Sequence, residues 1–163
     1  DKFVKKIYEF IYYKTFHKET AEDLASQTFL KALEKVKEFN PNIGSFSSWV
    51  YRIARNTVID YYRTKKVSVD IEDVWDLAVN ENIEEKIDNR ETLNKVKAHL
   101  SKLNPEQREI VVLRVWQEMS YEEISQIVGK SEANCRMAFS RGLAKLRKEM
   151  PMVLFIACIM LSR

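Results

Sequence analysis

The sequence predicts an all-α protein of two small helical domains joined by an acidic linker. Apolar residues recur at three- and four-residue intervals over most of the 163 residues, as they do on one face of an α-helix. No segment alternates apolar and polar residues as a half-buried strand would. Acidic residues outnumber basic ones between residues 71 and 92, whereas both flanking segments are basic within a net charge of +3.

Three helices are predicted before the linker. In the first, one face is formed by Phe3, Ile7, Phe10, Ile11 and Lys14. The second is expected to open at Thr20, with Asp23 three residues later in a capping arrangement, and to stop near Phe39. Its apolar stripe is predicted to contain Ala21, Leu24, Ala25, Thr28, Phe29, Ala32, Leu33 and Val36.

The turn-forming run 40–45 separates the second helix from a third, which is expected over residues 46–64. Its apolar side is predicted to hold Val50, Ile53, Ala54, Thr57, Val58 and Tyr61. Periodicity then fades from 67 to 91, with at most a short helical turn at 83–87. Helical patterning resumes with Leu93, Val96 and Leu100.

Cap residues mark the remaining helices. Asn104 followed by Pro105 predicts a helix start, and Ser120 with Glu123 forms a capping box that opens a short helix. Gly129 supplies the left-handed residue that ends this helix. Ser131 is expected to cap a last helix that runs to about Lys148.

Composition argues against an enzyme. Three glycines allow no phosphate-binding glycine loop, and two cysteines and two histidines allow neither a disulfide framework nor a zinc cluster. The sequence therefore predicts no catalytic residue, no metal and no cofactor, in a reducing cytoplasm.

Two segments carry features of nucleic-acid binding. Residues 120–146 read as helix, glycine turn and longer helix, the helix-turn-helix arrangement whose second helix can enter a DNA major groove; a hairpin with merely solvated cations is the alternative. Aromatic residues alternate with Arg and Lys between 49 and 66, as suits unstacked bases and their backbone. These rings and cations are Trp49, Tyr51, Arg52, Arg55, Tyr61, Tyr62, Arg63, Lys65 and Lys66. Some of the rings must face the core, and Trp49 and Tyr61 are equally compatible with a structural role.

The segments 44–56 and 58–63 resemble the promoter-melting segment of sigma-70 family factors, and most closely the extracytoplasmic-function (ECF) group. The run 21–29 is similar to the helix by which sigma domain 2 grips the RNA polymerase core. The runs 103–109 and 120–124 resemble sigma domain 4. The resemblance implies domain 2 at 1–68, a linker at 69–92, domain 4 at 93–149 and an unassigned apolar tail at 150–163.

The resemblance also implies roles for individual residues. Contacts with the −10 element, including an everted base, are expected from Ser45, Ser48, Trp49, Arg52, Arg55, Asn56, Arg63, Lys65 and Lys66. Duplex readout at −35 is expected from Ser131, Glu132, Asn134, Arg136, Met137, Arg141 and Lys145. Binding to the polymerase core is expected from Glu22, Asp23, Gln27, Leu30 and Lys31. The implied partners are bacterial RNA polymerase core, promoter DNA and an anti-sigma factor.

The chain departs from the family pattern at several positions. Ser26 and Gln27 replace a glutamine and an acid on the core-binding helix, and Asn134 and Cys135 replace a threonine and a valine in the last helix. The start at Asp1 indicates that some N-terminal sequence is missing. The ten apolar residues 152–161 are too few to cross a bilayer; they could pack on domain 4, begin a longer membrane segment or be a chain-end artefact.

Three functions are compatible with these features: a sigma-type initiation factor, a stand-alone helix-turn-helix regulator and a protein-binding helical adaptor. A stand-alone regulator would not explain the function of the helix at 46–66. A protein-binding adaptor would make few phosphate contacts.

Overall fold

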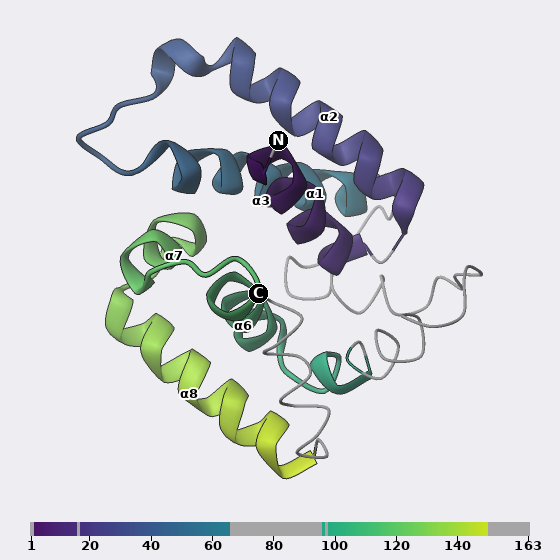
Figure 1. Ribbon diagram of the computed structural model, residues 1–163, viewed down its shortest axis with the longest axis vertical. Helices are drawn as coiled ribbons and strands as arrows, with labels where there is room; N and C mark the ends of the chain where they lie inside the picture. The colour runs from purple at the N-terminus through teal and green to yellow at the C-terminus, as the bar shows by residue number, and fades with distance from the viewer. Residues whose placement is uncertain (1, 16, 66–95, 97, 150–163) are drawn as a thin grey trace.

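The computed structural model describes residues 2–15, 17–65, 96 and 98–149. Helices α1 (Lys2–Thr15), α2 (Lys18–Glu34) and α3 (Phe46–Lys65) form one group, with a 3-10 turn η1 (Val36–Glu38) after α2. Helices α6 (Pro105–Val115), α7 (Tyr121–Val128) and α8 (Glu132–Glu149) form a second group (Figure 1). The described residues contain no strand, which confirms the all-α prediction. The expected linker, its helical turn at 83–87, the apolar tail and Lys66 lie outside the described residues.

Helices α6, α7 and α8 begin at the cap residues that the sequence predicts, and α7 ends at the predicted glycine. Asn104 accepts the Gln107 N–H at 2.8 Å with Pro105 in the first turn, and Ser120 and Glu123 form a reciprocal capping box. Gly129 ends α7 at φ +73°, and the Ser131 hydroxyl accepts the Asn134 N–H at 3.3 Å. Asn104, Ser120 and Ser131 satisfy N–H groups that a helix start leaves unpaired.

The start of α2 was predicted wrongly. The helix begins at Lys18, because the Nδ1 atom of His17 accepts the Thr20 N–H at 3.2 Å and makes His17 the N-cap. Thr20 therefore lies inside the first turn and does not cap the helix with Asp23.

The far end of the predicted α2 stripe is also wrong. Ala21, Leu24, Thr28 and Ala32 are buried as expected, but Leu33 is 71% and Val36 48% exposed. At 3.6 residues per turn, Leu33 lies about 100° round the helix from Ala32 and so points away from the core.

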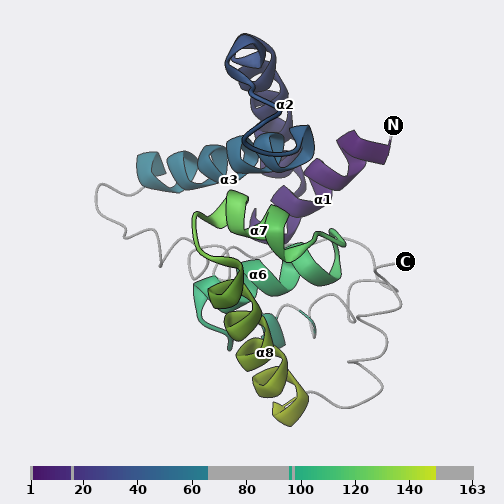
Figure 2. The ribbon, with the colours of Figure 1, turned by 90° about the vertical axis from the view of Figure 1, so that its left-hand side faces the viewer.

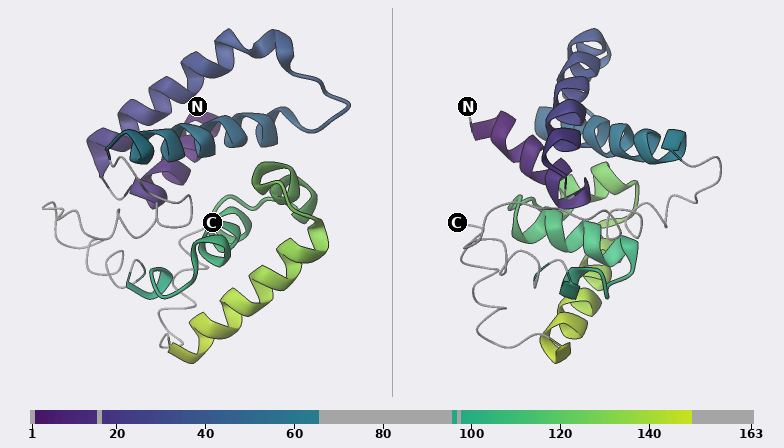
Figure 3. Two further views of the ribbon diagram at one scale, coloured as in Figure 1. Left: turned by 180° about the vertical axis from the view of Figure 1, so that it is seen from behind. Right: turned by 90° about the vertical axis from the view of Figure 1, so that its right-hand side faces the viewer.

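The two groups of helices are in direct contact (Figure 2). Helix α7 packs against α3, and α6 contacts α1. Seen from behind and from the right, α7 lies between α3 and the other helices of its group (Figure 3). None of the helices in the described ranges combines the length and apolar character that a membrane span requires.

Candidate nucleic-acid interface

The loop that leads into α3 is held by short-range hydrogen bonds. The Asn40 carboxamide oxygen accepts the Asn42 N–H at 3.0 Å, and the Ser45 hydroxyl accepts the Ser48 N–H at 3.1 Å. Ser45 therefore caps α3. The next residues of the helix join an aromatic cluster in which the Trp49 ring lies 5.5 Å from Phe39 and 5.6 Å from Phe46, measured between centroids.

A cavity of about 250 Å³ opens beside this loop. Phe39, Ile43, Trp49 and Arg52 form its wall on the α3 side, and Gln126 belongs to the wall on the α7 side. The cavity combines an aromatic ring with a guanidinium, the two kinds of group that hold an unstacked base.

The structure divides the predicted −10 residues into two sets. Arg52, Asn56 and Arg63 are exposed along α3, as is Ser45 at its start. Ser48 is only 3% exposed, Trp49 is half-buried, and the half-buried Arg55 is turned toward the second group of helices. Lys65 lies at the end of α3, and only its backbone is described.

Two of the four rings in the aromatic and basic segment 49–66 are core residues. Tyr51 and Tyr62 are 1% and 2% exposed, and the Tyr51 hydroxyl donates to Oε1 of Gln117 at 2.7 Å. Burial raises the pKa of Tyr51 far above its usual value. Trp49 and Tyr61 are half-buried, so they are the two of these four rings that retain accessible surface.

The predicted −35 residues lie on two sides of α8: Asn134, Met137 and Arg141 line a cavity with the first turn of α6, whereas Arg136 lies against the Tyr121 ring of α7. All seven are exposed, with Ser131 at the cap and Lys145 at the far end. The Arg136 guanidinium lies 4.6 Å from the Tyr121 ring centroid and donates to Glu132 at 3.0 Å, and Lys145 Nζ donates to the Lys102 carbonyl oxygen. Asn134, Arg141 and Lys145 thus place one amide and two cations on the same side of the helix, a pattern that suits base edges and phosphates.

The residues predicted to bind the RNA polymerase core lie on α2. Glu22, Asp23, Gln27 and Leu30 are exposed, but Lys31 turns toward α3, where its Nζ donates to the Thr57 hydroxyl at 3.3 Å and approaches Asp60 at 3.9 Å. Leu33, which the apolar spacing predicted to lie in the hydrophobic core, is instead exposed together with Leu30 and Glu22. Two exposed leucines beside acids form a surface suited to a protein partner.

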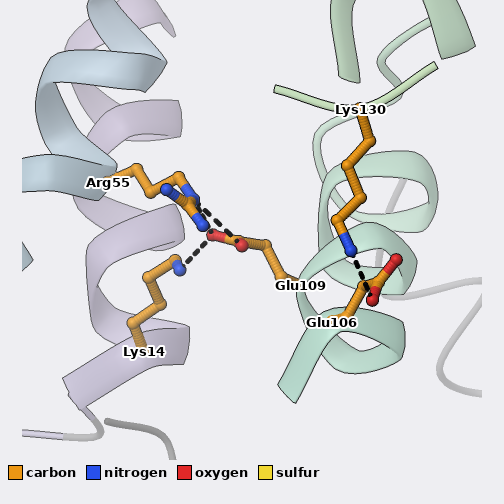
Figure 4. Close-up of polar contacts among 5 residues, drawn as sticks. All are labelled: Lys14, Arg55, Glu106, Glu109 and Lys130. Atoms are coloured by element: carbon orange, nitrogen blue, oxygen red, sulfur yellow. Dashed lines mark hydrogen bonds and ion pairs between the residues drawn. The ribbon is translucent and has the colours of Figure 1, made fainter. Parts of the chain in front are cut away.

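Sequence reasoning missed a buried ionic cluster between the two groups of helices. Glu109 of α6 accepts from Lys14 Nζ of α1 and from Arg55 Nε of α3, the latter at 3.1 and 3.2 Å (Figure 4). Burial alone would raise the pKa of Glu109, but attraction by Lys14 and Arg55 outweighs it and holds this pKa below its usual range. Burial lowers the pKa of Lys14 against the pull of Glu109. The available signal was Lys14, a lysine on the apolar face of its helix.

The described residues contain no cluster of ligands for a metal, and Cys135 is buried within α8 with its thiol pKa raised by burial. The geometry therefore defines a class: a helical protein with a helix-turn-helix module packed beside a loop-and-helix module that carries rings and cations.

The comparisons with known proteins agree with this class. The family description Sigma-70 region 2 matches residues 1–67, and Sigma-70 region 4 matches residues 93–146. The ECF RNA polymerase sigma factor BldN of Streptomyces coelicolor is 32% identical over 93% of this chain and 58% of its own length. The RNA polymerase sigma factor YlaC of Bacillus subtilis is 30% identical over 91% of this chain and 87% of its own length.

Solved structures show the same fold. The sigma factor RpoE from Bartonella quintana, in complex with the anti-sigma factor NepR, matches with a TM-score of 0.68 at 22% identity, over 90% of both chains. CnrH, in complex with the cytosolic domain of CnrY, matches with a TM-score of 0.68 at 23% identity, over 89% of this chain and 80% of CnrH.

The chain belongs to the sigma-70 family of RNA polymerase sigma factors, and within it to the ECF group. The prediction of a sigma-type initiation factor is thereby confirmed, and a stand-alone helix-turn-helix regulator is not favoured.

Proposed function

We propose that this chain binds the RNA polymerase core through the exposed face of α2 and directs it to promoters, with α3 opening the −10 region and α8 reading the −35 element. One observation carries the proposal: a single chain presents an exposed apolar and acidic helix face, a cavity lined by two aromatic rings and one guanidinium, and a helix α8 with exposed cations. Each surface suits a different partner of an initiation complex. Stretches 1–68 and 93–149 are proposed as the two functional domains.

The proposed function requires no chemical reaction at this chain. Capture of a base requires unstacking, which costs a few kcal/mol and is offset by stacking and hydrogen bonds in a pocket. The polymerase performs the chemistry, so the chain acts without a cofactor, in the cytoplasm. An anti-sigma factor is a proposed regulator, because the structurally similar sigma factor RpoE was solved in complex with the anti-sigma factor NepR.

Run-off transcription tests the proposal. Bacterial core polymerase with the chain should transcribe a subset of a random promoter pool that core alone does not, and sequencing the products gives the −35 and −10 preferences. The chain should also co-elute with core on gel filtration. Transcription equal to that of core alone, without co-elution, would contradict the proposal.

Arg63→Ala should weaken open-complex formation by about 1–3 kcal/mol and leave core binding unchanged. Arg63 is exposed near the end of α3, so its loss removes a proposed DNA contact without disturbing packing. Permanganate reactivity of the melted strand measures the effect. Lys5→Ala is the control, since Lys5 is an exposed cation of α1 paired with Glu9 at 3.7 Å. An equal loss of core binding would indicate misfolding or a wrong assignment.

Arg136→Ala should weaken binding to the −35 duplex by about 1–3 kcal/mol and relax specificity at one base pair. The guanidinium is held in place by Tyr121 and Glu132, so little entropy is lost when it meets a base. Competition between duplexes that differ at single positions measures this. Arg147→Ala, near the far end of α8, is the matched control. If only the salt dependence changes, Arg136 contacts phosphate and does not read a base.

A further inference from the structure

Helix α8 runs along the outer side of the second group of helices (Figure 1) and presents an apolar side chain to solvent. Cys135, Ala138 and Leu146 belong to the hydrophobic core and are at most 9% exposed. Met137 is 48% exposed. Because each helical residue turns by about 100°, Asn134 and Met137 lie on the same side of α8, close to one turn apart. The start of α8 therefore offers a carboxamide and a thioether to a ligand.

The Asn134 carboxamide is available for binding. The backbone N–H of this residue donates to the Ser131 hydroxyl at 3.3 Å, so Asn134 is fixed at the third position of the helix. Within the described residues, its side-chain amide makes no hydrogen bond. A carboxamide places an acceptor beside a donor, which is complementary to N6 and N7 of adenine in the major groove. The N-terminal residues of a recognition helix are those that contact base edges.

Met137 lies between two flanks that carry cations. Arg141 follows it by four residues on one flank, and the Arg136 guanidinium lies on the other flank against the Tyr121 ring. Cations on both flanks suit the phosphates that border a major groove. In a groove entered by this side of α8, the methionine meets the base edges, where the C5-methyl group of thymine is the apolar feature.

A cavity of about 210 Å³ adjoins these side chains. Asn134, Met137 and Arg141 line it on the α8 side, and the first turn of α6 forms the opposite side. Glu106 of that turn also lines the cavity, but its carboxylate is paired with Lys130 at 2.7 Å (Figure 4). The pair compensates the negative charge nearest to the proposed base contacts, and the cavity leaves the α8 side chains room to adjust to a base pair.

We infer that Asn134 and Met137 select A·T base pairs in duplex DNA. Asn134 does so by hydrogen bonds to N6 and N7 of an adenine, and Met137 by contact with the methyl group of a thymine. The inference rests on the proposed reading of duplex DNA by α8 and names the base pairs that are read. Guanine and cytosine do not offer these features, because guanine has an acceptor in place of the N6 donor and cytosine has no methyl group.

Selection from a random pool tests which base pairs are preferred. Duplexes with 20 random base pairs are selected by the 163-residue chain in complex with bacterial core polymerase, or by the chain alone if no complex forms. The parent should enrich A·T base pairs at two positions. Asn134→Ala should relax one position and Met137→Ala the other, whereas Arg147→Ala, which removes an exposed cation near the end of α8, should relax neither. Absence of two such positions would overturn the inference.

Asn134→Asp should change the preferred base. A carboxylate only accepts hydrogen bonds, so it loses the donor for adenine N7 and accepts instead from the N4 amino group of cytosine. An acidic residue in the first turn is favourable at a helix N-terminus, so α8 should stay folded. The relative affinity for C over A at that position should rise by at least about tenfold. An unchanged preference for adenine would contradict the role of Asn134.

Modified bases test the individual atoms on the duplex that the parent prefers. In anisotropy measurements, 7-deazaadenine, which lacks N7, should weaken parent binding by about fivefold, as expected for one lost hydrogen bond. Deoxyuridine, which lacks the methyl group, should weaken it by about fourfold. Asn134→Ala should not respond to 7-deazaadenine, and Met137→Ala should not respond to deoxyuridine. Met137→Leu keeps an apolar side chain and should still respond. Equal responses of the parent and both alanine variants would refute the assigned contacts.

Failure of the inference and failure of the proposed function give different results. If run-off transcription is absent while the selected site and the variants behave as expected, the initiation role is wrong and the choice of A·T base pairs stands. If transcription occurs while Asn134→Asp and Met137→Ala leave the −35 preference unchanged, the inference alone is wrong.

Discussion

A chain carrying Leu30→Asp and Leu33→Asp should bind RNA polymerase core at least about a hundredfold more weakly than the parent. The two leucines are 61% and 71% exposed on the outer face of α2. Each contributes roughly 1.5–3 kcal/mol if a partner buries it, and a tenfold change in affinity corresponds to about 1.4 kcal/mol. Neither side chain supports the core of the chain, so the melting temperature should be unchanged.

Met137→Asp is the control for this double variant. Met137 is 48% exposed on α8 and belongs to the predicted −35 face. It should keep core binding and lose −35 binding, whereas the α2 variant should show the reverse. Titration of labelled chain with core polymerase gives the first readout and anisotropy on −35 duplex gives the second. A loss of core binding smaller than about threefold in the α2 variant would contradict the assignment of this face.

Local signals made much of the fold predictable. Asn104, Ser120 and Gly129 mark helix ends through hydrogen bonds or backbone angles that depend on a few neighbouring residues. The exposed face of α8 follows in the same way from helical periodicity. The capping role of His17 escaped prediction because histidine is not among the usual N-cap residues.

The errors concern contacts that periodicity does not determine. The rings at Tyr51 and Tyr62 look alike in sequence to those at Trp49 and Tyr61, but only the neighbours that pack on each ring decide which are buried. Leu33 is exposed because the buried face of α2 is narrower than the apolar stripe in its sequence. Apolar spacing alone does not distinguish a leucine that packs in the hydrophobic core from an exposed leucine that could bind a partner.

The buried Lys14–Glu109–Arg55 cluster could not be predicted from the sequence for a different reason. Glu109 lies 95 residues from Lys14 and 54 from Arg55 along the chain. Their meeting depends on how the two groups of helices pack, which no local pattern specifies. The sequence offered only the anomaly of Lys14 on an apolar face, and a buried lysine requires a partner.

Arg108 is another charged residue of α6 whose role is visible only in the structure. It is 2% exposed, and its Nη2 atom donates to the carbonyl oxygens of Ser101 at 3.1 Å and Leu103 at 3.0 Å. The guanidinium therefore fixes the turn before α6 to the helix itself. Hydrogen bonds from a charged donor are worth about 1.5–3 kcal/mol each, more than those between neutral groups.

Arg108→Ala should destabilise the chain by about 3 kcal/mol or more, because it leaves two carbonyls without their donor and removes a buried side chain. In urea, where unfolding free energy falls by about 1–3 kcal/mol per molar, the midpoint should drop by about 1–3 M. Circular dichroism during urea titration measures it. Arg108→Met keeps most of the volume and separates the two causes: a midpoint close to that of Ala assigns the loss to the hydrogen bonds. A midpoint close to that of the parent would show instead that the two carbonyls do not depend on Arg108, because a methionine cannot donate to either of them.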